Sequence, residues 1–360
     1  MDSGEFSQEF ELDFPSPIVS GAPNNDNVKL TIIVPPDQTR PIPAVLILHY
    51  WGASDLRIER SMASELTKRG IGSVIMTLPY HLSRTPPGYR SGELAIQPDP
   101  STMRNVMLQS VLDARRAIDW MSEWPAFDKQ KLGVTGTSLG AIVASLTFAV
   151  EPRLKSAGFV LGGADLAHIL WNSSRVVEAR EVLRKKGFTE ERMREALKPI
   201  EPLNFLNRSD PRQSLVVGAV HDTVVPAVDT QKLIDALYHP HTIWLDTGHY
   251  GGAIAERRIF RSTAQFFLAS LNERIFEEPK RLIAPTIRIG FQVNAAQGLQ
   301  VVAGIDVWRS NTRGDYFASA LLTPRGGQGF LGARVTREVS LGIVLLPKKP
   351  TVGLFWSQVF

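Results

Sequence analysis

Six short apolar runs, each separated from the next by enough residues for a helix, constrain the fold of this 360-residue chain most strongly. They lie at residues 44–48, 71–78, in the segment that ends at Gly136, and at 157–161, 214–220 and 242–245. Continuous apolar runs are typical of strands buried on both faces, and the long spacings are incompatible with hairpins. The pattern therefore predicts an α/β fold with a mostly parallel, doubly wound sheet.

Helical periodicity fills the intervals between these runs. Residues 55–69, 103–124, 227–238 and 253–276 place apolar side chains on one stripe, as helices that cover a sheet do. Before them, Val28–Val34 alternates and predicts an outer antiparallel strand. We therefore predict an N-terminal arm over residues 1–27 and a main α/β domain over residues 28–278.

The strand and helix rhythm breaks after Gly162-Gly163. Residues 165–210 contain charged helical patterns at 175–186 and 190–197 and no strand pattern. We interpret this segment as a helical insertion and a candidate lid. The alternative is an ordinary crossover extended by surface helices.

The apolar period changes from helical to two beyond a linker at residues 277–281. Apolar residues alternate in 286–294, 299–307, 339–345 and 352–356, and Gly, Asn and Pro separate these runs. This pattern predicts a C-terminal antiparallel β meander of five or six strands over residues 283–360. We expect its apolar face to pack on the main domain or on a second copy, which makes a homo-oligomer possible.

Composition narrows the class of protein. The chain is 43% hydrophobic and 21% charged, with no cysteine and a net charge of +4, and no stretch resembles the roughly 18 apolar residues of a transmembrane segment. Residues 280–360 hold 10 Lys and Arg against 3 Asp and Glu, so a basic tail that binds an anionic surface is a second hypothesis. The acidic N-terminus lacks the order of a secretory signal, so we expect a cytoplasmic protein. No motif suggests a metal, a cofactor or a nucleic acid.

The segment Gly136-Thr-Ser138-Leu-Gly140 follows a strand pattern and precedes a helix of small and branched apolar residues. In this context G-x-S-x-G forms a tight turn that exposes the serine hydroxyl. The N–H of Leu139 then lies at a helix N-terminus, where it can donate to a developing oxyanion. The pattern predicts that Ser138 is a nucleophile, although a glycine-rich turn that merely contains serine is the alternative.

A nucleophilic serine needs a general base and an acid that orients the base. Asp222 follows the run 214–220, and His249 follows the run 242–245 in a glycine-rich loop. Loops after parallel strands gather at one edge of the sheet, so both residues are expected near Ser138. Other candidates for the acid are Asp229 and Asp246, and other histidines in the region are His221, His239 and His241.

Together these segments resemble the α/β-hydrolase superfamily, near its dienelactone-hydrolase-like and acetyl-xylan-esterase-like branch. The resemblance covers residues 28–275 and is carried by Leu46–His49 with Trp51-Gly52, Gly136–Gly140, Gly218–Pro226 and Gly248-His249. It implies a Ser138, Asp222 and His249 triad and a second oxyanion donor after His49. Tyr50 replaces the glycine that usually follows this histidine, so the donor is the N–H of Tyr50 or Trp51, or the Tyr50 hydroxyl.

The resemblance implies a serine esterase that acts on small or medium carboxylic esters through an acyl-enzyme. Thioester, peptide and carbon–carbon bond hydrolysis are alternatives on the same fold. The hypothesis from another class is that the C-terminal β module serves binding or oligomerisation.

Overall fold

The computed structural model describes residues 7–36, 38–279, 286–310, 316–336 and 338–359. The chain divides into two compact units. The first comprises Met1–Gly218, Val224–Ile243 and Arg257–Lys280, and the second comprises Ala219–Thr223, Trp244–Glu256 and Arg281–Phe360. Residues 280–285 are outside the described residues. They include the end of the predicted linker and the start of the predicted C-terminal module.

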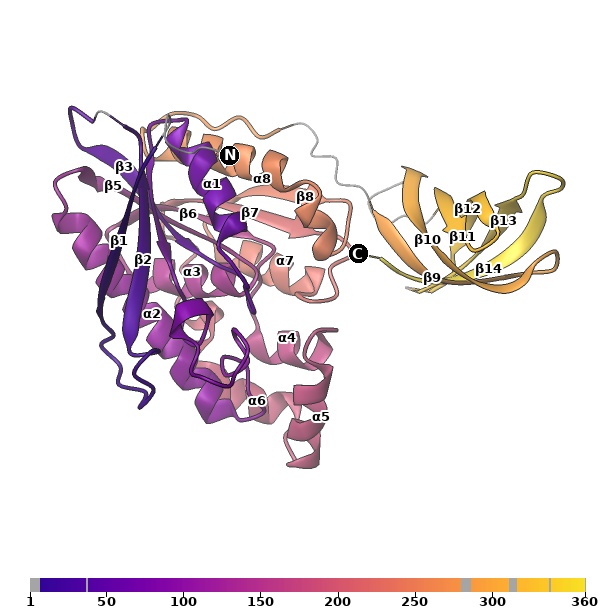
Figure 1. Ribbon diagram of the computed structural model, residues 1–360, viewed down its shortest axis with the longest axis horizontal. Helices are drawn as coiled ribbons and strands as arrows, with labels where there is room; N and C mark the ends of the chain where they lie inside the picture. Colours follow the sequence, from indigo (N-terminus) through magenta and orange to yellow (C-terminus); the bar gives the residue numbers. More distant parts are fainter. Residues whose placement is uncertain (1–6, 37, 280–285, 311–315, 337, 360) are drawn as a thin grey trace. The chain divides into compact units, whose positions relative to one another are not determined.

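An eight-stranded sheet has the order β1-β2-β4-β3-β5-β6-β7-β8 (Figure 1). Strands β3 to β7 pair in parallel with their neighbours, and β1 and β2 add an antiparallel edge. The doubly wound parallel sheet predicted from the apolar runs is confirmed. The strands are β1 Gln8–Pro15, β2 Asn27–Val34, β3 Ile42–Leu48, β4 Gly72–Met76, β5 Phe127–Thr137, β6 Leu154–Val160, β7 Gln213–Ala219 and β8 His241–Leu245.

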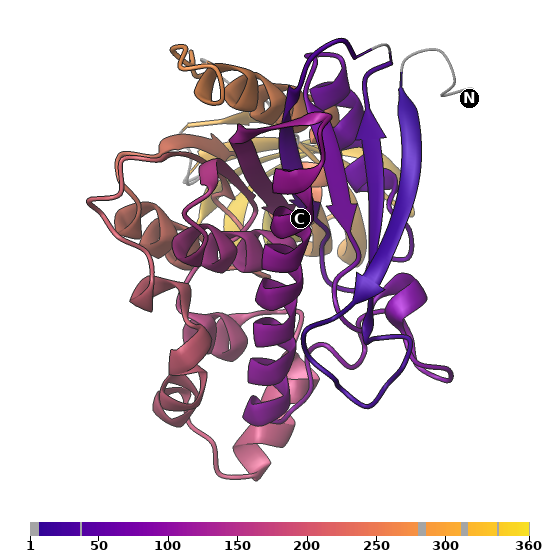
Figure 2. The same ribbon diagram turned by 90° about the vertical axis from the view of Figure 1, so that its left-hand side faces the viewer.

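Helices cover both faces of this sheet, with α1 and α8 on one side and α2 and α3 on the other (Figures 1 and 2). Gly133 of β5 shows how close they come, because a Cβ built there would lie 2.7 Å from the ring of Phe267 in α8. The helices of the chain are α1 Arg57–Thr67, α2 Pro100–Glu123, α3 Leu139–Val150, α4 Leu166–Asn172, α5 Val177–Lys185, α6 Glu190–Leu197, α7 Ala227–Ala236 and α8 Glu256–Ser270.

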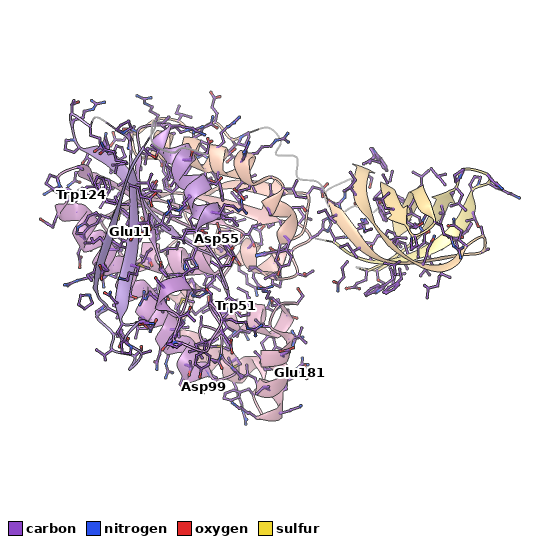
Figure 3. The ribbon with its side chains drawn as sticks, viewed as in Figure 1. Glu11, Trp51, Asp55, Asp99, Trp124 and Glu181 are labelled. Carbon is purple, nitrogen blue, oxygen red and sulfur yellow. The ribbon has the colours of Figure 1, made fainter. Side chains whose placement is uncertain are left out.

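The long helix α2 begins where its sequence requires. Asp99 accepts a hydrogen bond of 2.8 Å from the N–H of Thr102, and Pro100 occupies the first helical position, a combination that satisfies a free N–H and presets the backbone. This end of α2 lies toward α5 and its Glu181 (Figure 3), and Lys186 after α5 donates to the carbonyl of Pro98 at 2.8 Å.

Three helices, α4 to α6, and two short 3-10 turns, η2 Lys198–Ile200 and η3 Pro202–Asn204, separate β6 from β7. Helix α6 packs against α2 and α4. Its N-terminus is capped by Thr189, whose hydroxyl accepts from the N–H of Arg192. The helical insertion predicted between residues 165 and 210 is therefore present, and its role as a lid stays a prediction.

The C-terminal strands close into a six-stranded antiparallel barrel, in which β9 pairs with both β10 and β14. The prediction of five or six antiparallel strands is confirmed. The sequence did not predict that these strands close into a barrel. Periodicity did not locate β11 and β12, since glycines interrupt β12. The strands are β9 Ile287–Asn294, β10 Gly298–Arg309, β11 Tyr316–Thr323, β12 Gly326–Arg334, β13 Val339–Leu345 and β14 Thr351–Val359.

The barrel interior mixes a small apolar cluster with buried polar side chains, and many apolar side chains lie on its outer face. Its interior combines phenylalanines with a cluster of Gln292, Gln300 and Gln328 and with a buried ion pair of 2.7 Å between Arg288 and Asp306. The alternating apolar residues of all six strands instead face outward, and many are 40–71% exposed. That this face packs on the main domain or on a second copy stays a prediction.

Candidate active site

Ser138 lies on a strained turn between β5 and α3. Its backbone has φ 55° and ψ −114°, which side-chain-bearing residues rarely adopt. The N–H of Ser138 donates to the carbonyl of Val160 at 2.8 Å, and its own carbonyl accepts from the first turn of α3. This backbone conformation is the one expected of a nucleophile elbow.

The two glycines of the turn are required by close packing. A Cβ at Gly136 would lie 2.2 Å from the carbonyl of Gly140, and a Cβ at Gly140 would lie 2.1 Å from the carbonyl oxygen of Leu48 at the end of β3. Both neighbours are backbone and cannot rotate away. Glycine at these positions therefore lets α3 start directly beside the sheet, with the N–H of Leu139 in its first turn.

Asp222 and His249 are brought together within the second unit. His249 Nδ1 lies 2.6 Å from Asp222 Oδ2, and Asp222 is 2% exposed. The loops that carry them are joined by backbone hydrogen bonds of 3.0 Å from Val220 to Leu245 and from His221 to Thr247. A carboxylate on Nδ1 fixes the histidine tautomer that leaves Nε2 as a base.

The other candidate acids have different partners. Asp229 contacts His168 Nδ1 at 2.8 Å and Lys232 at 3.0 Å, whereas Asp246 contacts Arg309 and His221. His241 contacts Glu278 at 2.9 Å. The described contacts of Asp229, Asp246 and His241 therefore join them to residues outside the Asp222–His249 pair.

Arg309 is a residue that the sequence analysis missed. It extends from β10, is buried, and contacts both His221 and Asp246, which lie next to the loops of Asp222 and His249. Asp306 accepts a further hydrogen bond from Arg309 at 2.7 Å. No local pattern signals such a contact, because 88 residues separate Arg309 from His221.

The loop after β3 is held by His49. Its Nε2 accepts a hydrogen bond of 2.9 Å from the N–H of Leu78, so the proton lies on Nδ1, which donates to the carbonyl of Tyr50 at 2.8 Å. The Trp51 indole N–H donates to the carbonyl of Gly92 at 2.8 Å, and its ring lies 5.2 Å from the guanidinium of Arg175 (Trp51 is labelled in Figure 3). The side chain of Trp51 is thus held between the loop after β4 and Arg175 of the helical insertion. The second oxyanion donor stays a prediction.

Burial lowers the pKa of His49 to about 3 and that of His81 to about 4. The unfolded rings protonate near pH 6.5, so the unfolded chain binds more protons below that pH. We expect full stability from these rings above pH 6.5 and a loss of roughly 3 kcal/mol per ring as the pH falls to 4. Denaturant unfolding between pH 7 and 4 measures this loss.

The variant His81→Gln is the comparison for that experiment. Removing the buried ring should flatten the decline of the unfolding free energy between pH 7 and 4 relative to the wild type. Equal slopes for His81→Gln and the wild type would contradict the interpretation.

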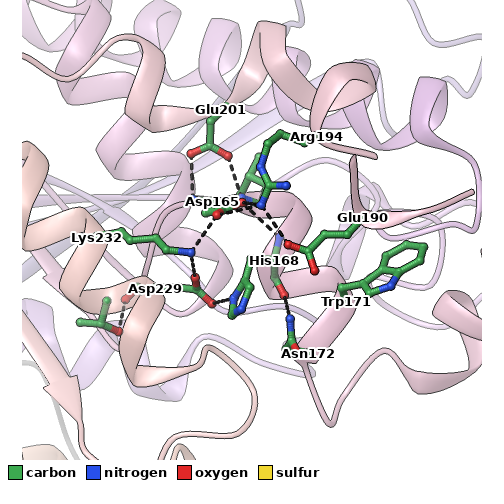
Figure 4. A network of polar contacts seen from close by, with 12 residues as sticks. Asp165, His168, Trp171, Asn172, Glu190, Arg194, Glu201, Asp229 and Lys232 are labelled. Carbon is green, nitrogen blue, oxygen red and sulfur yellow. Dashed lines mark hydrogen bonds and ion pairs between the residues drawn. The ribbon is translucent and has the colours of Figure 1, made fainter. Parts of the chain in front are cut away.

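A polar network fastens the helical insertion at both ends (Figure 4). Glu201 accepts from the N–H groups of Asp165 and Leu166 at 2.9 and 2.7 Å, so the end of the insertion binds its beginning. Asp165 in turn accepts from Arg194 of α6 at 3.0 Å and from Lys232 of α7 at 2.7 Å. The base of the insertion is therefore anchored to the sheet-covering helices.

Comparisons with known proteins agree with this architecture. The family model described as alpha/beta hydrolase domain containing 18 matches residues 2–161. Among solved structures, an acetyl xylan esterase from Paenibacillus sp. R4 is similar, with a TM-score of 0.59 and 16% identity over 75% of this chain and 86% of that chain. A search of curated proteins finds no match.

Two other solved structures are similar in the same way. A truncated carbohydrate esterase from gut microbiota has a TM-score of 0.53 and 19% identity over 75% of this chain and 99% of that chain. An esterase from Pyrobaculum calidifontis has a TM-score of 0.51 and 16% identity over 73% and 85%. These likenesses show that the chain has an α/β-hydrolase fold.

Among the residues that the structure describes, no helix is long and apolar enough to cross a membrane. Within the same residues, no group of three His, Asp or Glu side chains is placed to hold a metal ion.

Proposed function

We propose that this chain is a serine hydrolase that cleaves carboxylic esters of small to medium size through an acyl-enzyme. The hydrogen bond of 2.6 Å between His249 and Asp222 carries the proposal. The sequence predicts both residues as catalytic from their places after the last two strands of the sheet, without reference to any contact between them. The strained backbone of Ser138 supports the proposal. Several solved structures of similar fold are described as esterases.

In the proposed mechanism His249 Nε2 accepts the proton of Ser138 as its Oγ attacks the ester carbonyl carbon. The N–H of Leu139 and a second donor at Tyr50 or Trp51 stabilise the oxyanion. The tetrahedral intermediate collapses, the alcohol leaves with the proton from His249, and the acyl group stays on Ser138. Water activated by His249 then releases the carboxylic acid, while Asp222 stabilises the histidine cation.

A panel of nitrophenyl esters, run with a serine-directed fluorophosphonate, tests this proposal. We expect ester turnover that the phosphonate abolishes, with a single adduct that peptide mass spectrometry locates on Ser138. Turnover that persists after complete phosphonylation, or an adduct elsewhere, would contradict it. Thioester, anilide and β-diketone substrates in the same panel distinguish thioester, peptide-type and carbon–carbon bond hydrolysis, because the fold alone does not select the bond.

A second candidate function concerns the barrel, and we propose that its outer face binds a second copy of this chain. Leu322 is 70% exposed and Val352 is 65% exposed, and so much apolar surface is unusual on a monomer. The side chains of Arg288 and Arg309 are buried and pair with Asp306, so these two cations do not support an anionic partner on the outer face. Self-association buries the same face on every copy.

Light scattering coupled to size exclusion tests the association. We expect a dimer or larger species, and a shift toward monomer in the double variant Leu322→Glu/Val352→Glu. The control Val19→Glu changes an exposed residue of the first unit and should leave the mass unchanged. A wild-type monomer at micromolar concentration, or a monomer held in detergent micelles, would contradict self-association.

A further inference from the structure

An apolar cavity of about 100 Å³ lies in the first unit next to the nucleophile elbow. Leu139, the residue after Ser138, lines it together with Ile142 and Val143 of α3. The remaining walls come from α2, from the loop after β4 and from the helical insertion.

The lining offers almost nothing to a polar ligand. Its two side chains that carry polar groups, apart from thioethers, are Ser110 and His81. The Ser110 hydroxyl donates to the carbonyl of Val106 at 2.7 Å, and His81 Nδ1 lies 2.8 Å from the carbonyl of Pro79. Burial lowers the pKa of His81 to about 4, so its ring is neutral near pH 7. The one buried ring nitrogen of the lining without a hydrogen-bond partner, His81 Nε2, offers a single acceptor, so a sugar or a carboxylate placed here would lose most of its hydration without compensation.

The wall of the cavity that the helical insertion supplies is held in place by the polar network around Asp165 and Glu201. Leu166 and Ile169 belong to α4, which follows directly after Asp165, and Leu197 and Ile200 precede Glu201. Glu201 accepts hydrogen bonds from the N–H groups of Asp165 and Leu166. The first and last segments of the insertion, which both contribute lining residues, are therefore bound to each other. The cavity is therefore a largely preformed site rather than one that needs a loop to order.

We infer that this cavity binds the acyl chain of the ester, and that the preferred substrates carry an unbranched aliphatic acyl group of intermediate length. The inference rests on the proposed function. The acyl group stays bound to Ser138 while the alcohol leaves and water enters, so it suits a cavity beside the elbow better than the alcohol does. An apolar cavity of about 150 Å³ accommodates the six carbons of benzene, so a cavity of about 100 Å³ has room for roughly four carbons. An acetyl group would leave most of the space empty.

Two series of substrates distinguish binding of the acyl group in the cavity from binding of the alcohol group. The first varies the acid of nitrophenyl esters from acetate to decanoate, and the second varies the alcohol of acetate esters over the same lengths. Each buried methylene contributes about fourfold in binding, so we expect kcat/KM to rise on the order of 50-fold from acetate to pentanoate and to fall again by decanoate. The alcohol series should change much less.

Two variants change the cavity in opposite directions. Val106→Phe fills it from α2 and should lower kcat/KM for pentanoate at least tenfold more than for acetate. Leu170→Ala enlarges it from α4 and should move the optimum toward longer acids. Leu108→Phe is the matched control, because Leu108 lies on the same helix, is 44% exposed and does not line the cavity.

The possible failures are distinguishable. No ester turnover and no phosphonate adduct on Ser138 would overturn the proposed function itself. Turnover with acetate as the best acid, or with an optimum set by the alcohol, would overturn the acyl assignment alone. If Val106→Phe does not fold, an unchanged optimum in Leu170→Ala still contradicts the assignment.

Discussion

Replacing Ser138 by alanine is expected to lower kcat/KM for nitrophenyl esters by a factor on the order of 10⁴ or more, because the nucleophile is then missing. His249→Ala should lose a similar amount. The double variant should be no worse than either single variant, since the two groups act in one step. Initial rates with the best ester of the acyl series measure the effect.

The controls for this prediction come from the same elements. Ser145→Ala removes another hydroxyl of α3, one that donates to the carbonyl of Ile142 at 2.8 Å, and it should retain near-wild-type rates. His241→Ala tests a histidine that contacts Glu278 and should also stay active. Additive losses for Ser138→Ala and His249→Ala, or an active Ser138→Ala enzyme, would contradict the triad.

Arg84→Met is expected to destabilise the fold by about 3–5 kcal/mol, because it leaves a buried carboxylate without its cation. Arg84 Nη2 lies 2.8 Å from Asp113 Oδ2, and both side chains are fully buried. Arg84 also donates to the carbonyls of Thr77 and Asn25 at 2.9 and 3.0 Å, and Ser16 donates to Asp113 at 2.6 Å. Denaturant unfolding at pH 7 measures the loss.

A second substitution separates a lost charge partner from lost packing. In Arg84→Met/Asp113→Leu no charge remains buried, so much of the stability should return. Arg90→Met removes an arginine whose side chain is 90% exposed and should cost less than about 1 kcal/mol. A double variant as unstable as Arg84→Met would show that the carbonyl contacts of Arg84, rather than its pairing, dominate.

The Arg84 substitution also bears on the site. Arg84 anchors the loop after β4, which supplies His81 and Ala95 to the cavity and the Gly92 carbonyl to Trp51. A partly folded Arg84→Met enzyme should therefore lose its preference for intermediate acyl chains before it loses acetate turnover. Kinetics at temperatures below the unfolding transition measure this order.

Much of the α/β fold could be predicted because its information is local. Apolar runs of β-strand length give the strands, helical periodicity gives α1, α2 and α8, and two glycines around Ser138 identify the elbow. Asp222 follows β7 and His249 follows β8, so parallel topology alone places both residues at the same edge of the sheet. Their hydrogen bond is the contact that the structure added.

The cavity and the buried charges could not be predicted in this way. The apolar residues of α2, α3 and α4 have the pattern of any core helix, and only their packing leaves a space beside Leu139. Arg84 and Asp113 are 29 residues apart, and neither carries a local signal that distinguishes it from a surface charge. Arg309 reaches His221 across 88 residues.

The barrel shows most clearly which features the sequence determines and which only the tertiary structure decides. Alternation by itself determined that the C-terminal residues form antiparallel strands, because the side-chain period of a strand is two. It could not tell which set of alternating residues faces inward, since a closed sheet has an inside only when its first and last strands pair. The pairing of β9 with β14 decided that Gln292 and Arg288 face inward and that Phe291 and Val293 face outward. Sequence thus determined most of the elements and the order of the proposed catalytic residues, whereas β11, β12 and the choice of buried surfaces were decided by tertiary structure.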